Sequence, residues 1–479
     1  MRKKNNKYKE IYKYLSIVLV IVSLLTMGLL FFLNVLPGKF FFIASAIIAI
    51  INIILINWLR KKSTKRIVST ILSIVLIIGM IACIFYEINT LDFLSKIGSN
   101  KFKKITYELV VLNNNDYSNV DDLENKFIGL LNTTESDYNQ AVKFLKKKIE
   151  FKEEKYEDIG LIADELLTKE IDAMLIEQSR NNILKEENSD YQSKTKVIYS
   201  FDIEVAIENI VKKVDVTKDS FNIYLSGIDT YGTVNSVSRS DVNIIASINP
   251  VTKKVHFTSI PRDYYVKLHS KAGYKDKLTH AGIYGVEESV NTIEDLLNMD
   301  INYYVKVNFT SLIDIVDAIG PITVYSNYDF ETGIYDKHTV PYTFNKGKNI
   351  LNGSEALAFA RERKAFASGD RVRNENQQLV LEGIVDKILS PAILAKYPTL
   401  LDSLSNAFVT NMTDEEITSI IKQQLDTNAS WKVTSYVLEG NDDYDYTYSY
   451  KSAKSYVMVP DRESVNESIK KINEILITE

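Results

Sequence analysis

Three long apolar segments at the start of the chain constrain its fold more than any other feature. They cover residues 11–36, 40–59 and 67–88, and each is about 20 residues or longer, enough to cross the roughly 30 Å hydrocarbon layer of a membrane. The first is too long for a secretory signal peptide, and no small-x-small cleavage site separates it from the second. We therefore expect three transmembrane helices within residues 11–89 rather than buried helices of a soluble core.

Basic residues flank these segments unevenly and predict their orientation. The first loop holds only Pro37, Gly38 and Lys39, whereas basic residues gather before the first segment and in the loop 60–66. Loops rich in Lys and Arg stay on the cytoplasmic side of a membrane. The tail 1–10 and the loop 60–66 are therefore predicted to be cytoplasmic, and everything beyond the third segment is predicted to lie outside the cell.

Composition excludes several classes of function. The net charge of -5 argues against a protein that coats nucleic acid, and the cytoplasmic tail and loop are too small to read DNA as a transcriptional attenuator would. A single cysteine, Cys83, excludes an internal disulfide framework. The four histidines are scattered without the spacing of metal ligands, which argues against a zinc enzyme.

Residues 90–214 predict a small extracellular α/β accessory domain. Its sequence alternates between strand-like and helix-like patterns: strands at 107–112 and 173–176, helices starting at 120 and covering 141–156 and 159–167. We find no group of polar residues in it that indicates chemistry, so a spacer or binding module is the favoured interpretation.

A larger α/β domain is predicted over residues 215–400, with residues 401–479 as its C-terminal extension. The expected strands are 221–225, 242–249, 254–260 and 303–307, and the expected helices are 285–297, 309–319, 354–362 and 375–389. The extension carries a helix at about 414–426 and a tyrosine-rich run at 444–450 that alternates like a strand. This pattern predicts a central sheet flanked by helices.

Two aspartates stand at neighbouring strand ends in this domain. Asp229 follows a strand at a glycine turn, and Asp241 opens the next strand. Two such carboxylates can converge on one hard divalent cation, although aspartate is also an ordinary turn residue. Arg239 lies two positions before Asp241 on an extended chain and therefore points to the same side. This conjunction favours a site over simple turn chemistry.

Further basic residues follow in two clusters. Arg262 comes directly after a strand and a proline, and Arg361 and Arg363 close a helix. A surface ion pair or the helix dipole would explain either cluster alone. Guanidinium forks, however, bind phosphate oxygens in a bidentate way, and together the clusters suggest chemistry on a phosphorylated lipid. The remaining candidates are Lys277, which alone is a weak one, Asp370, Arg373 and Gln377.

The order and content of these motifs resemble the LytR–CpsA–Psr family over about residues 221–390. The motifs that carry the resemblance are Leu225-Ser-Gly-Ile-Asp229, Ser238-Arg-Ser-Asp241, Ser259-Ile-Pro-Arg-Asp263, Lys277-Leu-Thr-His-Ala281, Ala360-Arg-Glu-Arg363 and Gly369-Asp-Arg-Val-Arg373. Three membrane segments followed by an extra domain are similar to the capsule-associated, CpsA or Wzg-type branch.

The resemblance implies a membrane phosphotransferase of Gram-positive bacteria. Such an enzyme moves a glycopolymer from an undecaprenyl-diphosphate carrier to peptidoglycan. The branch implies capsular polysaccharide as the polymer and other capsule-assembly proteins as further partners, and no nucleic acid is expected. The implied fold has a hydrophobic cleft for the polyprenyl tail. The apolar helices at 286–297 and 309–319 agree with such a cleft and equally with an ordinary core.

The family pattern also implies residue roles. It puts Asp229 and Asp241 on Mg²⁺ or Mn²⁺, Asp370 braced by Arg373 at the proton of the acceptor hydroxyl, and the diphosphate among Arg239, Arg262, Lys277, Arg361, Arg363 and Gln377. Many relatives carry arginine where this chain has Asn376, so one basic contact is either missing or supplied by Arg371. Arg262→Ala or Arg361→Ala is expected to abolish polymer attachment while leaving the protein folded.

Two other functions remain open at this level. One is a non-catalytic protein that binds polyprenyl phosphate and regulates or scaffolds capsule assembly. The other is a polyprenyl-diphosphate hydrolase that uses water as the acceptor. Wall teichoic acid also remains open as the polymer.

Overall fold

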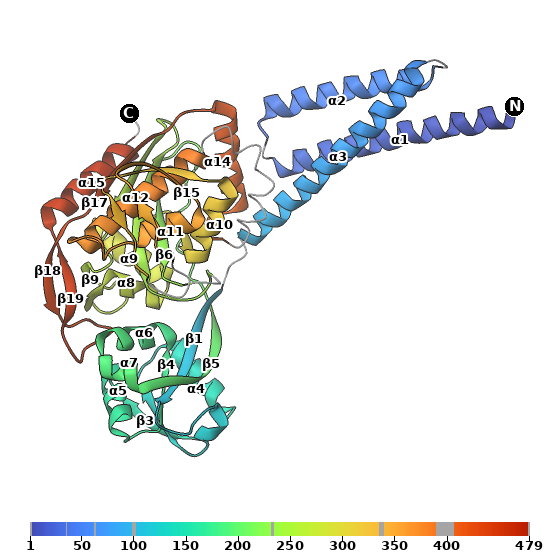
Figure 1. The fold of residues 1–479 in the computed structure, drawn as a ribbon. Coiled ribbons are helices and arrows are strands. Elements are labelled where there is room, and N and C mark those ends of the chain that lie inside the picture. The colour runs from blue at the N-terminus through green and yellow to red at the C-terminus, as the bar shows by residue number, and fades with distance from the viewer. Residues whose placement is uncertain are drawn as a thin grey trace.

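The computed structural model describes residues 2–34, 36–61, 64–97, 102–230, 234–334, 340–388 and 407–477. It contains a bundle of long helices, a small α/β domain and a larger α/β domain (Figure 1). Residues 389–406, which hold the predicted end of the helix 375–389 and the predicted boundary at residue 400, lie outside the described residues.

The N-terminal bundle consists of α1 (Arg2–Leu33), α2 (Gly38–Leu59) and α3 (Thr64–Ile97). Within the described residues, three helices are long and apolar enough to cross a membrane, at Glu10–Leu33, Gly38–Leu59 and Thr64–Asp92. Leu19, Leu55 and Met80 pack together between them. Many of the other apolar side chains face outward, as expected for helices that lie in lipid.

The loop between α1 and α2 lies against the larger domain. Lys39 Nζ is 2.8 Å from Asp426 Oδ1, and Lys422 donates a 2.6 Å hydrogen bond to Asn34 Oδ1. Both partners belong to α14 (Asp414–Thr427). The N-terminus lies at the far end of the bundle (Figure 1). This loop and the larger domain are therefore at the same end of the helices.

The accessory domain is a five-stranded sheet of order β3-β2-β4-β1-β5. Its elements are β1 (Phe102–Leu112), β2 (Phe127–Leu131), α4 (Ser136–Lys146), β3 (Lys152–Tyr156), α5 (Ile159–Thr168), β4 (Ala173–Glu177), α6 (Gln178–Glu187), α7 (Ser189–Lys194) and β5 (Thr195–Ala206). The predicted helix 141–156 is wrong in its second half, because Lys152–Tyr156 is an edge strand. Its exposed charged side chains suit an edge and imitate an amphipathic helix in the sequence.

The larger domain has a six-stranded mixed sheet of order β16-β11-β6-β7-β8-β17. The strands are β6 (Phe221–Ile228), β7 (Ser240–Asn249), β8 (Lys254–Ser259), β11 (Tyr303–Asn308), β16 (Val409–Thr410) and β17 (Lys432–Val437). β11 runs parallel to β6, and β17 runs parallel to β8. Both outer strands come from the C-terminal extension, which is therefore an integral part of the sheet.

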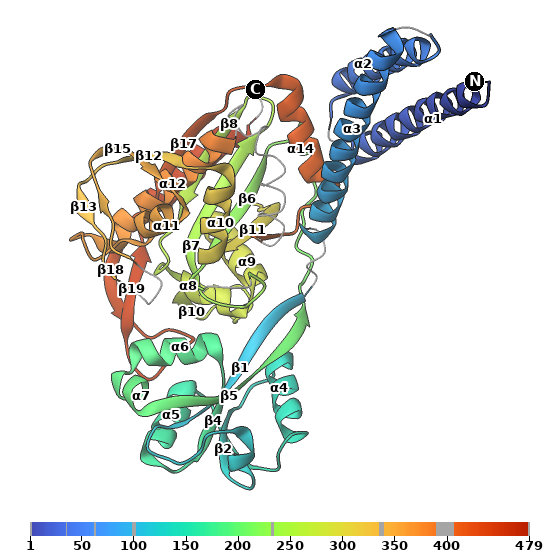
Figure 2. The ribbon, with the colours of Figure 1, turned by 45° about the vertical axis from the view of Figure 1, so that its right-hand side comes forward.

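Helices cover both faces of this sheet (Figure 2). On one face, Tyr224 and Ile245 pack in a core with α8 (Leu278–Ala281), α9 (Val286–Leu297) and α15 (Arg462–Leu476). The other face is covered by α10 (Phe309–Ile319), α11 (Gly353–Arg361) and α12 (Gly369–Ile388). α12 begins earlier than the predicted residue 375, so Asp370 and Arg373 lie within its first turns.

Short antiparallel ribbons complete the domain. They pair β9 (Tyr265–Lys267) with β10 (Lys275–Lys277), β12 (Ile322–Ser326) with β15 (Gly347–Leu351), β13 (Phe330–Glu331) with β14 (Thr343–Phe344), and β18 (Gly440–Asp445) with β19 (Ser455–Pro460). The tyrosine-rich run predicted as a strand at 444–450 is therefore strand only at its first two residues.

Candidate active site

A cavity of about 610 Å³ lies between the central sheet and helices α10, α11 and α12. Residues two apart on a strand, and three or four apart on a helix, share one face. That periodicity gives the cavity an apolar wall made of Leu225, Val242, Ile244, Val305, Val307, Phe309, Leu312, Ile315, Leu357, Ala360, Val380, Leu381 and Ile384. The cavity can therefore hold an extended hydrocarbon.

Only one of the two helices proposed for the lipid cleft contributes to this wall. Phe309, Leu312 and Ile315 of α10 line the cavity. In α9, by contrast, Val290, Ile293 and Leu297 are buried in the core on the opposite face of the sheet. For residues 286–297 the ordinary-core alternative therefore holds.

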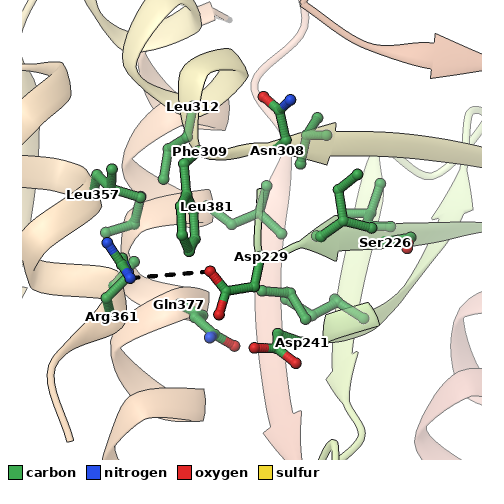
Figure 3. Close-up of a pocket in the computed structure, with 18 of the residues that line it drawn as sticks. Ser226, Asp229, Asp241, Asn308, Phe309, Leu312, Leu357, Arg361, Gln377 and Leu381 are labelled. Atoms are coloured by element: carbon green, nitrogen blue, oxygen red, sulfur yellow. Dashed lines mark ion pairs between the residues drawn. The ribbon is translucent and has the colours of Figure 1, made fainter. Parts of the chain in front are cut away.

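One end of the cavity is charged because several strand ends meet there. β6 and β7 pair in antiparallel fashion with Ile228 opposite Ser240. This register brings Asp229, just past the end of β6, next to Asp241 near the start of β7. Figure 3 shows both carboxylates at the same end of the cavity, with Gln377 beside them and Arg361 facing Asp229. We call this end the cavity mouth.

Asp241 and Arg262 form the buried centre of the mouth. Arg262 Nη1 is 2.9 Å from Asp241 Oδ2, and its Nε is 3.5 Å from Asp263 Oδ2. Thr279 donates a 3.0 Å hydrogen bond to Asp241 Oδ1. Burial alone would raise the pKa of Asp241, but Arg262 and Arg239 outweigh burial and hold that pKa well below its usual range. Asp241 is therefore ionised at neutral pH.

Asp229 is in a different electrostatic state. Burial and the charge of Asp241 raise the pKa of Asp229, although Arg361 and its neighbours oppose the rise. Arg361 Nη2 lies 4.0 Å from Asp229 Oδ1, and its guanidinium lies 4.0 Å from the centre of the Phe309 ring. Two close carboxylates that disfavour each other's charge are stabilised when a cation lies between them.

Arg373 and Gln377 bring α12 into the mouth. Both line the cavity, and they lie four residues apart on one helical face. Arg373 Nη2 is 3.0 Å from Asp370 Oδ1. Its buried Nε has no hydrogen-bond partner among the residues that the structure covers, and burial together with Arg262 lowers the pKa of this guanidinium. A buried donor without a partner is costly, so an anionic ligand here would stabilise it.

Arginines outnumber carboxylates around the cavity. Of the described lining residues, the five arginines are Arg239, Arg262, Arg361, Arg363 and Arg373, and the three acids are Asp229, Asp241 and Glu186. The mouth therefore favours an anion with several oxygens.

Four residues considered from sequence are not among the described residues that line the cavity. Asp370 lies beside it, with its Oδ1 3.0 Å from Arg373 Nη2. Lys277 is not among the cavity-lining residues, and its Nζ is 3.1 Å from Glu187 Oε1 of α6. Arg371, suggested as a replacement contact, turns away: it donates a 3.1 Å hydrogen bond to the Gly440 carbonyl and faces Asp442. Asn376 donates a 3.3 Å hydrogen bond to the Phe359 carbonyl and ties α12 to α11.

Sequence reasoning missed Glu186. It lies in α6 of the accessory domain, lines the cavity and forms an ion pair with Arg239 Nη1. The two residues are 53 positions apart in sequence, and Glu186 belongs to no motif. Only the packing of the two domains brings it to the mouth. The accessory domain, in which the sequence shows no group of polar residues that indicates chemistry, thus contributes one residue to the lining of the cavity.

The side chains at the mouth could supply only part of the coordination shell of a metal ion. Across the described residues no group of three or more His, Cys, Asp or Glu side chains could hold a metal by itself. Mg²⁺, however, commonly binds through one or two carboxylates and completes its shell with water and substrate phosphates. The donor set of Asp229 and Asp241 fits that pattern, in which the phosphates belong to the substrate.

The fold and the site thus define an α/β protein, joined to long apolar helices, whose cavity is built for an amphiphilic anion. The chain belongs to the LytR–CpsA–Psr family: the model described as "LytR_cpsA_psr family" matches residues 174–470. The match begins inside the accessory domain and includes α6 and both outer strands of the central sheet.

Named relatives agree with this family. The chain is 35% identical over 239 residues to the polyisoprenyl-teichoic acid–peptidoglycan teichoic acid transferase TagU of Bacillus licheniformis. This alignment covers 50% of this chain and 74% of the relative. It is 36% identical over 211 residues to the protein of the same name from Bacillus subtilis, covering 44% of this chain and 66% of the relative. The crystal structure of B. subtilis TagV aligns with a TM-score of 0.46 at 31% identity, over 54% of this chain and 98% of that structure.

Proposed function

We propose that this protein is a membrane-anchored phosphotransferase that moves a glycopolymer from a polyprenyl-diphosphate carrier to peptidoglycan. The observation that carries the proposal is one continuous cavity with an apolar wall and a mouth rich in arginine. A polyprenyl diphosphate has the same two parts, a long hydrocarbon and a compact anion. The names of the family relatives, which are teichoic acid–peptidoglycan transferases, support the reaction class.

Within this proposal, the apolar wall binds the polyprenyl chain and the mouth binds the diphosphate. Arg262 and Arg373 are held by carboxylates at 2.9 and 3.0 Å, and Arg361 is held against the Phe309 ring. Donors that are held in place before the reaction need no reorganisation as charge develops on the phosphate oxygens. This positioning and charge stabilisation is the main contribution of a protein to phosphoryl transfer.

The proposed step is a displacement at the glycan-linked phosphorus. The oxygen of an acceptor hydroxyl forms a new bond to this phosphorus, and the bond from the phosphorus to the bridging oxygen breaks. Polyprenyl monophosphate leaves with the bonding electron pair, and the acceptor proton passes to Asp370. Asp370 lies in the first turn of α12, beside Arg373, and its carboxylate has an oxygen left to accept the proton.

Asp229 and Asp241 are the residues that would hold Mg²⁺ or Mn²⁺ in this site. Such an ion would neutralise charge on the diphosphate and on the leaving phosphate. It would also relieve the repulsion between the two carboxylates that raises the pKa of Asp229.

The proposed location is the cell membrane, with the N-terminus cytoplasmic and both folded domains outside. The flanking basic residues favour a position of the α1–α2 loop outside the cell. Lys39 and Asn34 contact α14 of the larger domain. These two observations support the proposed topology.

The polymer that we propose is capsular polysaccharide, on the basis of the three apolar helices and the accessory domain. The relatives' names make wall teichoic acid the competing polymer. The rates of transfer of the two polymers can be compared with the purified protein. A rate at least tenfold higher for one polymer would identify it as the substrate.

The proposed function can be tested with the full chain in detergent micelles, supplied with a polyprenyl-diphosphate-linked glycan, Mg²⁺ and peptidoglycan. We expect release of polyprenyl monophosphate and a new phosphodiester on peptidoglycan, both lost in Asp229→Asn. Release of polyprenyl monophosphate without a peptidoglycan product would identify a hydrolase. Tight binding without release of polyprenyl monophosphate would identify a binding scaffold.

A further inference from the structure

Helix α6 of the accessory domain connects two charged regions of the molecule. Its first turn carries Arg180, which is buried and lies 2.6 Å from Glu135 Oε2. Its last turn carries Glu186 at the cavity mouth and Glu187 beside Lys277. Because the helix is fixed at both ends, packing sets the position of the Glu186 backbone.

Glu186 and Arg239 form an unequal pair. The Arg239 side chain is 10% exposed, whereas the Glu186 side chain is 54% exposed. Burial raises the pKa of Glu186, but Arg239 and then Arg262 outweigh it, and the net shift is downward. The carboxylate is therefore ionised at neutral pH. It contacts the buried guanidinium from the solvent side, where it can move away at little cost.

We propose that Glu186 occupies the position on Arg239 that a phosphate oxygen of the donor takes, and that it competes with the donor's diphosphate. The inference rests on the proposed function, which identifies the ligand as a diphosphate. A guanidinium fork binds carboxylate and phosphate with the same geometry. A diphosphate bound in the mouth also repels Glu186, because both are negative. Glu186 is thus an affinity-setting residue that the accessory domain adds to the active site.

Glu187 provides a matched comparison. It is the next residue of the same helix and has the same side chain, but it pairs with Lys277 outside the cavity lining. This pair keeps the end of α6 in place when Glu186 leaves Arg239. Replacement of Glu187 therefore tests the contact between the domains without changing the charge of the mouth.

The experiment titrates the full chain in detergent micelles with inorganic pyrophosphate, farnesyl diphosphate and, as a neutral probe, farnesol. We expect Glu186→Gln to bind both diphosphate probes about tenfold more tightly, since a like charge at a partly exposed site changes binding by roughly one order of magnitude. Glu186→Gln should bind farnesol as the wild type does. Glu187→Gln should leave all three affinities unchanged, and Glu186→Asp, which keeps the charge, should bind diphosphate as the wild type does.

The outcomes separate this inference from the proposed function. If Glu186→Gln binds diphosphate equally or more weakly while the wild type binds it in an Arg361-dependent way, the competition is refuted and the proposed function stands. If the wild type binds neither diphosphate probe, the proposed function fails, and the inference fails with it. An equal gain in affinity for farnesol would also refute the competition, because it would show a change in the cavity and not in its charge.

Discussion

Two arginines in this molecule have the same kind of carboxylate partners and different roles. Arg262, at the cavity mouth, lies 2.9 Å from Asp241 and 3.5 Å from Asp263. Arg180, at the junction between the domains, lies 2.6 Å from Glu135 and 3.5 Å from Glu177. In each case two carboxylates bracket a guanidinium that is almost inaccessible to solvent. The arginine with its carboxylates is therefore not what marks a binding site.

The difference lies in what surrounds each arginine. At the junction the charges are matched, because Arg180 and Lys271 face Glu135 and Glu177, and the adjoining cavity is only about 80 Å³. The larger cavity is about 610 Å³ and has an apolar wall, and five arginines and three acids are among the described residues that line it. A surplus of cations in the lining of a large apolar cavity indicates a site, whereas a matched set beside a small cavity indicates a structural junction.

The largest expected effect is on stability and concerns the junction between the domains. Arg180→Ala leaves the buried Glu177 and the partly buried Glu135 without their shared partner, so we expect the free energy of unfolding to fall by about 3–5 kcal/mol. Urea denaturation of the full chain in detergent measures it. Lys218→Ala removes an exposed pair with Asp215 and is the control, with an expected change below about 1 kcal/mol. A loss at Arg180 no larger than the control would mean that the junction is an ordinary surface contact.

The next effect concerns the mouth and should appear in activity. Arg361→Ala removes one fixed donor, for which a loss of about 10²–10³ in the rate of transfer is expected. The free energy of unfolding should change less than in Arg180→Ala, because the Asp229 side chain is 35% exposed whereas that of Glu177 is 6% exposed. Arg371→Ala, which changes an arginine outside the cavity lining, should keep the wild-type rate. A large loss of stability in Arg361→Ala would mean that the charged residues of the mouth, like those of the junction, mainly stabilise the fold.

Arg262→Ala is the less decisive variant, contrary to the expectation from sequence. Arg262 is held by Asp241 and Asp263 in a buried position. Its removal leaves two carboxylates uncompensated, which is destabilising by itself. Lost activity in this variant would therefore not separate a failed reaction from a failed fold.

The apolar wall is the second feature that the junction lacks. Leu312→Asn puts an uncharged amide on the wall at a partly buried position, so the protein should fold, but a bound hydrocarbon would bury that polar group. We expect the affinity for farnesyl diphosphate to fall about thirtyfold, since burial of one leucine side chain contributes about 2 kcal/mol. The affinity for inorganic pyrophosphate should not change. Leu312→Met, which conserves volume, is the control, and equal losses for both probes would contradict a separate lipid wall.

The mouth could be predicted from sequence better than the wall. Asp229, Asp241 and Arg262 follow or open strands, and strand ends meet at the edges of a sheet, so their convergence follows from the strand pattern. The helices at 286–297 and 309–319 have the same kind of apolar face. Their period does not say whether that face meets a core or a cavity. The sequence therefore favours α9 and α10 equally as walls of the lipid cavity.

The contribution of the accessory domain could not be predicted at all. Glu186 and Arg180 lie on one short helix, and nothing in its sequence indicates which residues meet the neighbouring domain. The sequence predicts a helix over Lys152–Tyr156, where the structure has a strand, because a charged edge strand and a charged helix face look alike in sequence. Contacts between domains depend on how the two units pack, and this information is spread over both surfaces.

The smallest expected effect is a pH dependence of stability that comes from the junction between the domains. Burial raises the pKa of Glu177 to about 7, against the partial compensation of Arg180 and Ser179, whereas an unfolded glutamate titrates near 4.3. The folded protein therefore binds a proton here more tightly than the unfolded chain does. Stability should rise as the pH falls from 8 to 6, by about 1 kcal/mol for this one group. Urea denaturation of the wild type and of Glu177→Gln at both pH values isolates the effect, because the other titrating groups are common to both. Parallel pH profiles would show that Glu177 keeps its charge in the folded state at both pH values, which would contradict this prediction.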